Sequence, residues 1–212
     1  MTNFLQRLLL YQLIFLIVPI AYATPSDIVI YPGEAYIQSA NYSGTGCPIG
    51  STDFIFQEGA NEFSVSFKHF KVDNDANYSS SYCQLKFTIV APPGVAYRLN
   101  SLTYKGHATL DQSGMATIAN NSRLQSITPI NKSTQYVYGS LDNTTEQYFQ
   151  QTTLTDHLQN WSACNRHAPL EIKTEVSLNS KDQQSTITIK SINGKILFSR
   201  KHCSSRLNAK SI

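Results

Sequence analysis

Charged residues are scarce in this sequence. Seventeen lysines and arginines and fourteen acidic residues make up only 15% of the 212 residues, and the formal net charge is +3. So weak a field excludes the broad basic surface that nucleic acid or an anionic membrane would attract. We therefore expect no nucleic-acid partner.

Motifs that identify enzymes are also missing. The chain has no G-x-S-x-G elbow and no H-E-x-x-H helix, and Gly44, Gly46 and Gly50 fit neither phosphate-loop pattern. These gaps argue against nucleotide binding and the common hydrolase mechanisms. An extracellular hydrolase with an unrecognised site stays the alternative, and its candidate residues are Asp156, His157, His167, Glu171 and Glu175.

Long apolar runs are absent except at the start. Arg7 precedes an apolar run over residues 8–21, and Ala21-Tyr22-Ala23 follows it. A positive start, an apolar stretch and a small-x-small site are the parts of a secretory signal peptide. We expect cleavage near Ala23, removing residues 1–23, and a secreted product that is extracellular or periplasmic. No later segment is apolar enough to span a membrane.

Cysteines are few, but their number is even. The four cysteines are Cys47, Cys83, Cys164 and Cys203, and an even number in an exported chain indicates two disulfides. Three pairings exist, of which we favour Cys47–Cys83 and Cys164–Cys203 because each would brace one half of the chain. The rival is a zinc site that combines Cys164 and Cys203 with His167 and His202.

Helical periodicity is lacking, whereas alternation of apolar and polar residues recurs. It runs through 63–68, 83–89 and 170–178, while residues 95–104 are expected to continue as another strand and residues 27–30 would form a further short strand. The stretch 82–118 is predicted to form four strands of one sheet, and the residues of 120–160 to form strands joined by long polar loops. Residues 105–107 indicate a bulge, and Asn193-Gly194 predicts a two-residue hairpin before a strand that begins at Ile196.

These patterns predict an all-β fold, an antiparallel β-sandwich for which a jelly roll is one arrangement. A closed barrel is the structural alternative. We expect one domain over residues 24–203, braced by two disulfides, and a frayed tail over 204–212.

Oxygen-rich and aromatic residues supply the candidate binding sites. Asp73, Asp75 and Asn77 alternate like the opening of a calcium loop, but Tyr78 and Gln84 stand where an EF-hand needs Gly and Glu. We therefore expect no EF-hand and no bound cofactor, with calcium in this loop as the alternative. Exposed tyrosines suit stacking on sugars or protein surfaces, although each could equally cap the core. The candidates, all in polar contexts, are Tyr42, Tyr78, Tyr82, Tyr136 and Tyr138.

Six Asn-x-Ser/Thr sequons complete the inventory. In a eukaryotic chain they would mark surface loops that carry glycans, and in a bacterial chain they would reflect composition alone. They begin at Asn41, Asn77, Asn120, Asn131, Asn143 and Asn160.

Several segments together resemble a known family. They are Gly46-Cys47-Pro48-Ile49-Gly50-Ser51, Tyr82-Cys83-Gln84-Leu85, Pro93-Gly94, the run from Leu102 to Asp111, Trp161-Ser162-Ala163-Cys164 and a final Cys203. In this order they are similar to the domain of unknown function 4360, small secreted proteins of fungi and bacteria. The resemblance implies export and a cysteine-braced fold, and no activity. We expect a binding or surface-interaction module for an extracellular carbohydrate or protein.

Overall fold

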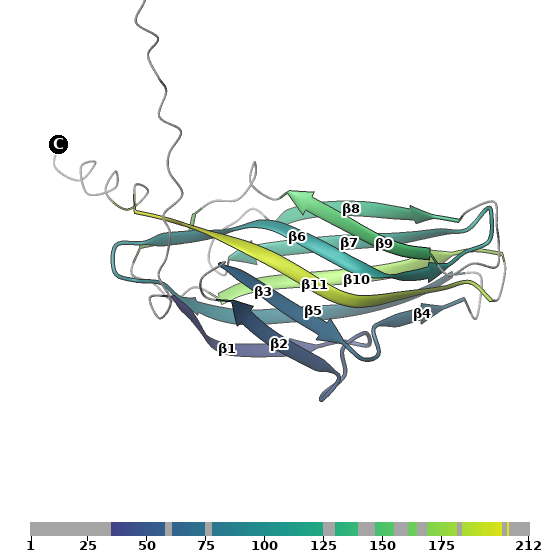
Figure 1. The fold of residues 1–212 in the computed structure, drawn as a ribbon, viewed down its shortest axis with the longest axis horizontal. Helices are drawn as coiled ribbons and strands as arrows, with labels where there is room; N and C mark the ends of the chain where they lie inside the picture. The colour runs from purple at the N-terminus through teal and green to yellow at the C-terminus, as the bar shows by residue number, and fades with distance from the viewer. Residues whose placement is uncertain are drawn as a thin grey trace, which may run out of the picture.

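The computed structural model describes residues 35–57, 61–74, 78–124, 130–139, 147–154, 161–164, 169–181, 184–200 and 203. Regular structure in this part of the chain consists of eleven β-strands (Figure 1). They are β1 (Tyr36–Ser43), β2 (Thr52–Gln57), β3 (Glu62–Phe67), β4 (Lys71–Asp73), β5 (Tyr78–Val90), β6 (Ala96–Thr109), β7 (Met115–Leu124), β8 (Asn131–Tyr138), β9 (Gln147–Leu154), β10 (Pro169–Asn179) and β11 (Thr186–Ser199). The expected signal peptide 1–23, the strand at 27–30 and the tail 204–212 lie outside the described residues.

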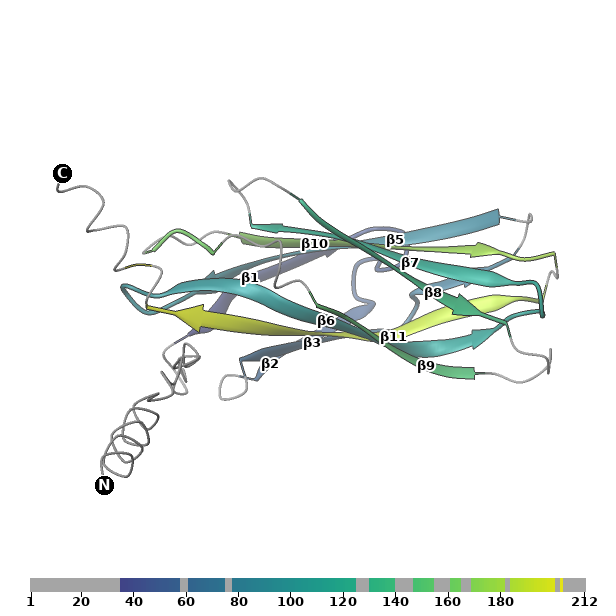
Figure 2. The ribbon, with the colours of Figure 1, turned by 90° about the horizontal axis from the view of Figure 1, so that it is seen from above.

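The strands form two antiparallel sheets that stack face to face in two layers (Figure 2). The five-stranded sheet has the order β1-β5-β10-β7-β8. The six-stranded sheet has the order β2-β3-β11-β6-β9, and β4 also pairs with β11. Each ladder among the described strands joins members of one sheet, so the fold is a sandwich rather than a barrel. The predicted fold class is confirmed.

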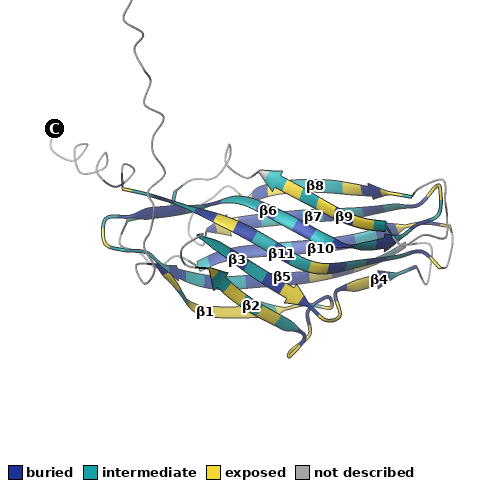
Figure 3. Cartoon of the chain, in the orientation of Figure 1, coloured by how far each residue is buried: buried dark blue, intermediate teal, exposed yellow. Residues whose placement is uncertain are grey.

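The core lies between the sheets, and along most strands buried positions alternate with more exposed ones, as the colours of Figure 3 show. In β5, for example, Leu85, Phe87 and Ile89 are buried and the residues between them are not. The rings of Phe63 in β3 and Phe87 meet across the sheets at 4.8 Å between centroids. Burial of apolar area stabilises by about 25 cal/mol per Å², so this alternation favours packing of the two layers against each other. No helix in the described ranges is long and apolar enough to cross a bilayer.

The stretch 82–118 does not form four strands of one sheet. It contributes β5 and β7 to the five-stranded sheet and β6 to the six-stranded sheet, so the chain crosses the core at each turn. Strand β6 continues through residues 105–107. The irregularity predicted there lies on the neighbouring strand, where the register shifts between Ile189 and Ser191 of β11. Periodicity identifies a strand but does not identify its sheet or its partner.

Asn193-Gly194 does not form the predicted hairpin. Strand β11 runs through this pair, and Gly194 lies opposite Phe63 of β3 and Leu102 of β6. A Cβ atom on Gly194 would lie 2.1 Å from Cζ of Phe63. Glycine is needed here because a buried ring occupies the space of a side chain, not because the backbone turns.

Two disulfides brace the sandwich, as expected, and they join Cys47 to Cys83 and Cys164 to Cys203. This is the pairing favoured from the sequence, and it leaves no free cysteine for the zinc alternative. Cys47 lies between β1 and β2, where the chain passes from one sheet to the other, and its bridge ties that crossing to β5. Sequence separations of 36 and 39 correspond to about 4 kcal/mol each in the chain-entropy model.

Candidate functional site

The outer face of the five-stranded sheet aligns side chains from four strands. The register pairs Gln84 of β5 with Lys173 of β10, Lys173 with Asn121 of β7, and Asn121 with Lys132 of β8. Residues paired in this way point to the same face, and neighbouring strands lie about 4.8 Å apart. The four residues therefore form one straight row about 14 Å long.

Three of the predicted tyrosines gather on this face. Tyr136 and Tyr138 of β8 are 47% and 64% exposed, and their rings stack with centroids 6.1 Å apart and planes 29° apart. Tyr82 of β5 is 39% exposed, and the Nζ of Lys173 lies 5.1 Å from its ring centroid. Exposed rings that stack on one another present flat apolar area next to polar groups, an arrangement typical of binding surfaces.

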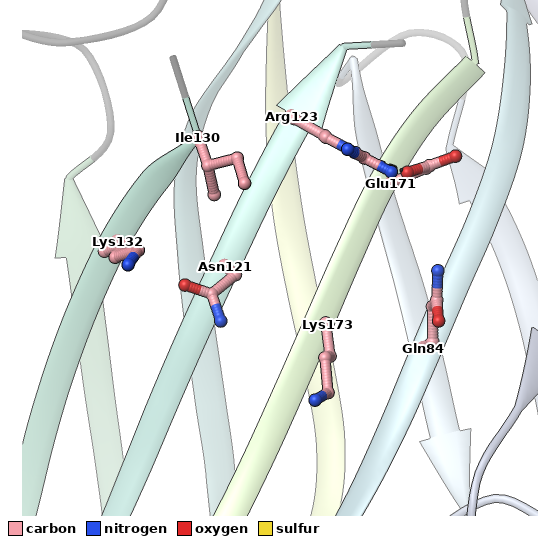
Figure 4. A pocket seen from close by; sticks show the side chains of 7 residues that line it. All are labelled: Gln84, Asn121, Arg123, Ile130, Lys132, Glu171 and Lys173. Carbon is pink, nitrogen blue, oxygen red and sulfur yellow. Dashed lines mark hydrogen bonds and ion pairs between the residues drawn. The ribbon is translucent and has the colours of Figure 1, made fainter. Parts of the chain in front are cut away.

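A shallow pocket of about 340 Å³, hereafter the lysine pocket, lies on the same face. Its side chains come from β5, β10, β7 and the start of β8 (Figure 4). Amide and ammonium groups dominate the lining, and one isoleucine adds apolar contact. The lining residues are Gln84, Asn121, Arg123, Ile130, Lys132, Glu171 and Lys173.

An ion-pair network centred on the buried carboxylate of Glu171 supports one wall of the lysine pocket. The side chain of Glu171 is only 9% exposed, and its Oε2 accepts a hydrogen bond of 2.6 Å from Nε of Arg123. Nζ of Lys86 lies 3.5 Å from its Oε1. A carboxylate this deeply buried requires such partners, so Glu171 holds Arg123 against the sheet at the rim (Figure 4).

The other two candidate tyrosines lie elsewhere or are not described. Tyr42 of β1 packs partly buried against the core, and its hydroxyl accepts a hydrogen bond of 2.9 Å from the backbone N of Gly50. Tyr78 begins β5, but its side chain lies outside the described residues. We therefore build the candidate site on Tyr82, Tyr136 and Tyr138.

Of the calcium candidates, the structure describes Asp73 alone. It ends β4, and its Oδ1 lies 2.6 Å from Nζ of Lys71. Asp75 and Asn77 fall in the undescribed segment 75–77. In the described ranges, no three His, Cys, Asp or Glu residues come together as a metal site would require.

The hydrolase candidates are brought together only in part. Glu171 lines the lysine pocket, while Glu175, four residues on, pairs with Lys173 at 3.6 Å and does not line it. Asp156, His157 and His167 lie outside the described residues. The described lining thus holds one carboxylate, already paired, where glycoside hydrolysis generally uses two.

Two of the sequons lie inside the sandwich. Asn120 of β7 and Asn131 of β8 are 2% and 8% exposed, so the expectation of surface loops is wrong for them. Asn41 of β1 is exposed on the five-stranded sheet. The sequons at Asn77, Asn143 and Asn160 lie outside the described residues. Burial excludes Asn120 and Asn131 as glycan acceptors in the folded protein.

The outer face of the six-stranded sheet carries a second shallow pocket, of about 320 Å³. Its lining is mainly hydroxyl and amide, and its one ring, Phe63, is 1% exposed. Exposed Tyr148 of β9 stands near it, with its ring 5.6 Å from that of His107. Neither pocket has an exposed ring in its lining, but the lysine pocket shares its sheet face with the stacked pair Tyr136 and Tyr138, so the second pocket is the weaker candidate.

Sequence reasoning missed most of the lysine pocket. The alternation over 83–89 and 170–178 implies that Gln84 and Lys173 lie on the outward faces of their strands, but no such pattern assigns Asn121 or Lys132 to a strand face. The signal that could have found them is the alternation of buried and exposed residues in β7 and β8. Placing all four in one row requires the strand order β5-β10-β7-β8, which the sequence does not contain.

Fold and site together define a disulfide-braced antiparallel β-sandwich with a basic, tyrosine-bearing sheet face. The chain belongs to the family described as "Domain of unknown function (DUF4360)", which matches residues 33–203. An "Uncharacterized secreted protein" of Arthroderma benhamiae is 22% identical over 156 residues, which are 72% of this chain and 62% of that protein. The chain thus spans less than two thirds of this relative's length.

Some solved structures share a general likeness of fold. A carbohydrate-binding module, TmCBM61 in complex with beta-1,4-galactotriose, is 11% identical with a TM-score of 0.31, over 77% of this chain and 89% of that one. CBM28, a non-crystalline cellulose specific module, is 10% identical with a TM-score of 0.34, over 76% and 86%. A family 29 carbohydrate-binding module is 10% identical with a TM-score of 0.27, over 81% of this chain and 99% of that one. Scores this low carry no argument about binding.

Proposed function

We propose that this protein is an exported binding module that holds a carbohydrate on the outer face of its five-stranded sheet. The observation that carries the proposal is the exposed, stacked pair Tyr136 and Tyr138 on the same face as the lysine pocket. Sugar rings have apolar faces that pack on aromatic rings, and hydroxyl groups that need both donors and acceptors.

The geometry of β8 supports an extended ligand. Lys132, Thr134, Tyr136 and Tyr138 alternate along one strand and pair with outward residues of β7. At a rise of about 3.4 Å per residue, Lys132 and Tyr136 lie about 14 Å apart. A linear oligosaccharide lying along β8 would contact the pocket at one end and the tyrosine pair at the other. Amides at Gln84 and Asn121 offer donors and acceptors for its hydroxyl groups.

The proposal includes the route of the chain out of the cell. We propose that the signal peptide ends near Ala23 and that residues 24–203 form the single exported domain, followed by a short tail over 204–212. The apolar run 8–21, the Ala-x-Ala site and the word "secreted" in the name of the relative support this. Two disulfides fit an oxidising compartment.

A glycan array probed with the purified secreted product tests the proposal. We expect wild type to bind one glycan class, and the variant that combines Tyr136→Ala with Tyr138→Ala to bind it at least about tenfold more weakly, because about 1.4 kcal/mol of ring contact is lost. Tyr148→Ala is the matched control, since Tyr148 is 60% exposed but lies on β9 of the other sheet. The proposal would be wrong if wild type bound no glycan on the array, or if the double variant bound as tightly as wild type.

A further inference from the structure

We propose that the ligand of this face is an acidic glycan and that Lys132 and Lys173 bind its anionic group. This inference rests on the proposed function and adds the chemical class of the sugar. It begins from the charges on the face. Among the described residues, the outer face of the five-stranded sheet carries four cations and two carboxylates. The cations are Lys86, Arg123, Lys132 and Lys173, and the carboxylates are Glu171 and Glu175.

The two carboxylates do not neutralise these cations equally. Arg123 and Lys86 both pair with the buried Glu171. Lys173 lies 3.6 Å from the exposed Glu175 and also contacts the Tyr82 ring, so its contact with the carboxylate is loose and screened by water. Lys132 has no acidic partner in the part of the chain that the structure describes. The excess positive charge is therefore concentrated in the row that crosses the pocket.

The register turns this excess into a specific arrangement. Asn121 pairs with Lys132 on one side and with Lys173 on the other, so two ammonium groups flank one amide (Figure 4). A carboxylate or sulfate between the two lysines could accept bonds from both and from the amide NH₂ of Asn121. Gln84 and Ile130 border the same pocket and remain for the hydroxyl groups and the apolar edge of the sugar.

The shared chemistry is an anionic sugar, and uronic acid carboxylates and sulfate esters are its two sources. In both cases the anionic group belongs to a sugar polymer whose rings can also stack on tyrosine, whereas a simple anion offers the charge alone. A free inorganic ion bound between the lysines is too small to contact Tyr136 and Tyr138 as well, because these tyrosines follow Lys132 along β8. We therefore expect the polymer to bind far more tightly than its anionic group alone.

Affinity electrophoresis or calorimetry on the full secreted product, with polygalacturonate, dextran sulfate, neutral dextran and polyglutamate, tests the inference. We expect one of the two acidic polysaccharides to bind at least about tenfold more tightly than dextran, with the affinity falling as salt rises from about 50 to about 500 mM. Lys132→Gln and Lys173→Gln should each lower the affinity about tenfold, the loss expected for one charge-assisted bond. Lys190→Gln, an exposed lysine of β11 in the other sheet, should leave it unchanged.

The outcomes separate the two proposals. If the protein prefers a neutral glycan on the array and the lysine variants keep the wild-type affinity, the ligand is not an acidic glycan. Carbohydrate binding would still stand in that case. Equal retention by polyglutamate, or equal losses in Lys190→Gln and Lys132→Gln, would show plain ion exchange and overturn the inference. Failure with every glycan, acidic or neutral, would overturn the proposed function itself.

Discussion

The two sheets contain similar alternating sequences but present different outer faces. Between β5, β10, β7 and β8 the register continues without a shift, and cations, carboxylates and tyrosines align across the strands. In the six-stranded sheet the central pair β6 and β11 shifts register twice, between Ile189 and Ser191 and between Lys195 and Ile196. Its outward residues combine Ser, Thr, Asn and Gln with charges such as Glu62, Lys105 and Lys195, and its exposed Tyr148 contacts His107.

This contrast separates the proposed binding face from the opposite face of the sandwich. Uninterrupted pairing brings side chains from four strands into straight rows, so charge and aromatic area accumulate in one place. Bulges increase twist and re-aim side chains, so outward rows in the six-stranded sheet stay straight only between its two shifts, as in the row Ser64, Asn193, Thr103 and Thr152. Its inner face is packed so tightly that Gly106 and Gly194 lie against the rings of Phe149 and Phe63.

The largest expected effect tests the tight packing of the six-stranded sheet. Gly194→Ala would normally stabilise by restricting the unfolded chain, but here we expect a loss of about 2 to 3 kcal/mol because the new methyl group overlaps the Phe63 ring. Urea unfolding measures it. In a Phe63→Leu background the same substitution should cost much less. A full cost in both backgrounds would mean that Gly194 serves the backbone rather than the ring.

A smaller effect tests the ordered charges of the five-stranded sheet. Glu171→Gln removes the buried partner of Arg123 and Lys86, and we expect a loss of about 1 to 2 kcal/mol, because both cations are half exposed and water replaces part of the interaction. Glu175→Gln is the control. Its carboxylate is 45% exposed, and we expect a loss below about 0.5 kcal/mol. Equal losses in the two variants would show that burial of Glu171 has no energetic role.

The smallest effect tests a buried hydrogen bond that links the two sheets through the core. The hydroxyl of Tyr104 in β6 lies 3.3 Å from Oγ1 of Thr174 in β10, and both residues are fully buried. Tyr104→Phe should cost about 1 kcal/mol at neutral pH, because the Thr174 hydroxyl loses its partner. Chemical unfolding at pH 8 gives this value.

The same variant has a signed pH dependence. Burial raises the pKa of Tyr104 well above its usual value, while its hydrogen bond with Thr174 acts in the opposite direction. The unfolded chain therefore releases this proton first, and wild type loses stability as pH rises above about 10, at up to about 1.4 kcal/mol per pH unit. Tyr104→Phe lacks this component, so its deficit should shrink between about pH 10 and pH 11. Parallel pH profiles of the two proteins would contradict this.

Much of the architecture was predictable because it depends on local chemistry. Alternation at residues 83–89 and 170–178 predicted β5 and β10, since one buried face requires apolar residues at every second position. The cysteine count predicted two disulfides. The prediction of a hairpin at Asn193-Gly194 was wrong because glycine fits both a turn and a position under an aromatic ring. Local sequence does not distinguish the two.

Sequence alone established an all-β chain held by paired cysteines, and it identified tyrosine as the residue type most suited to a ligand. It did not establish that Tyr82, Tyr136 and Tyr138 share a face, or that Lys132 and Lys173 flank Asn121. Those relations depend on which strands become neighbours and in what register. Strand order is set by packing and hydrogen bonding between segments far apart in the chain, so it emerges only when the whole domain has folded.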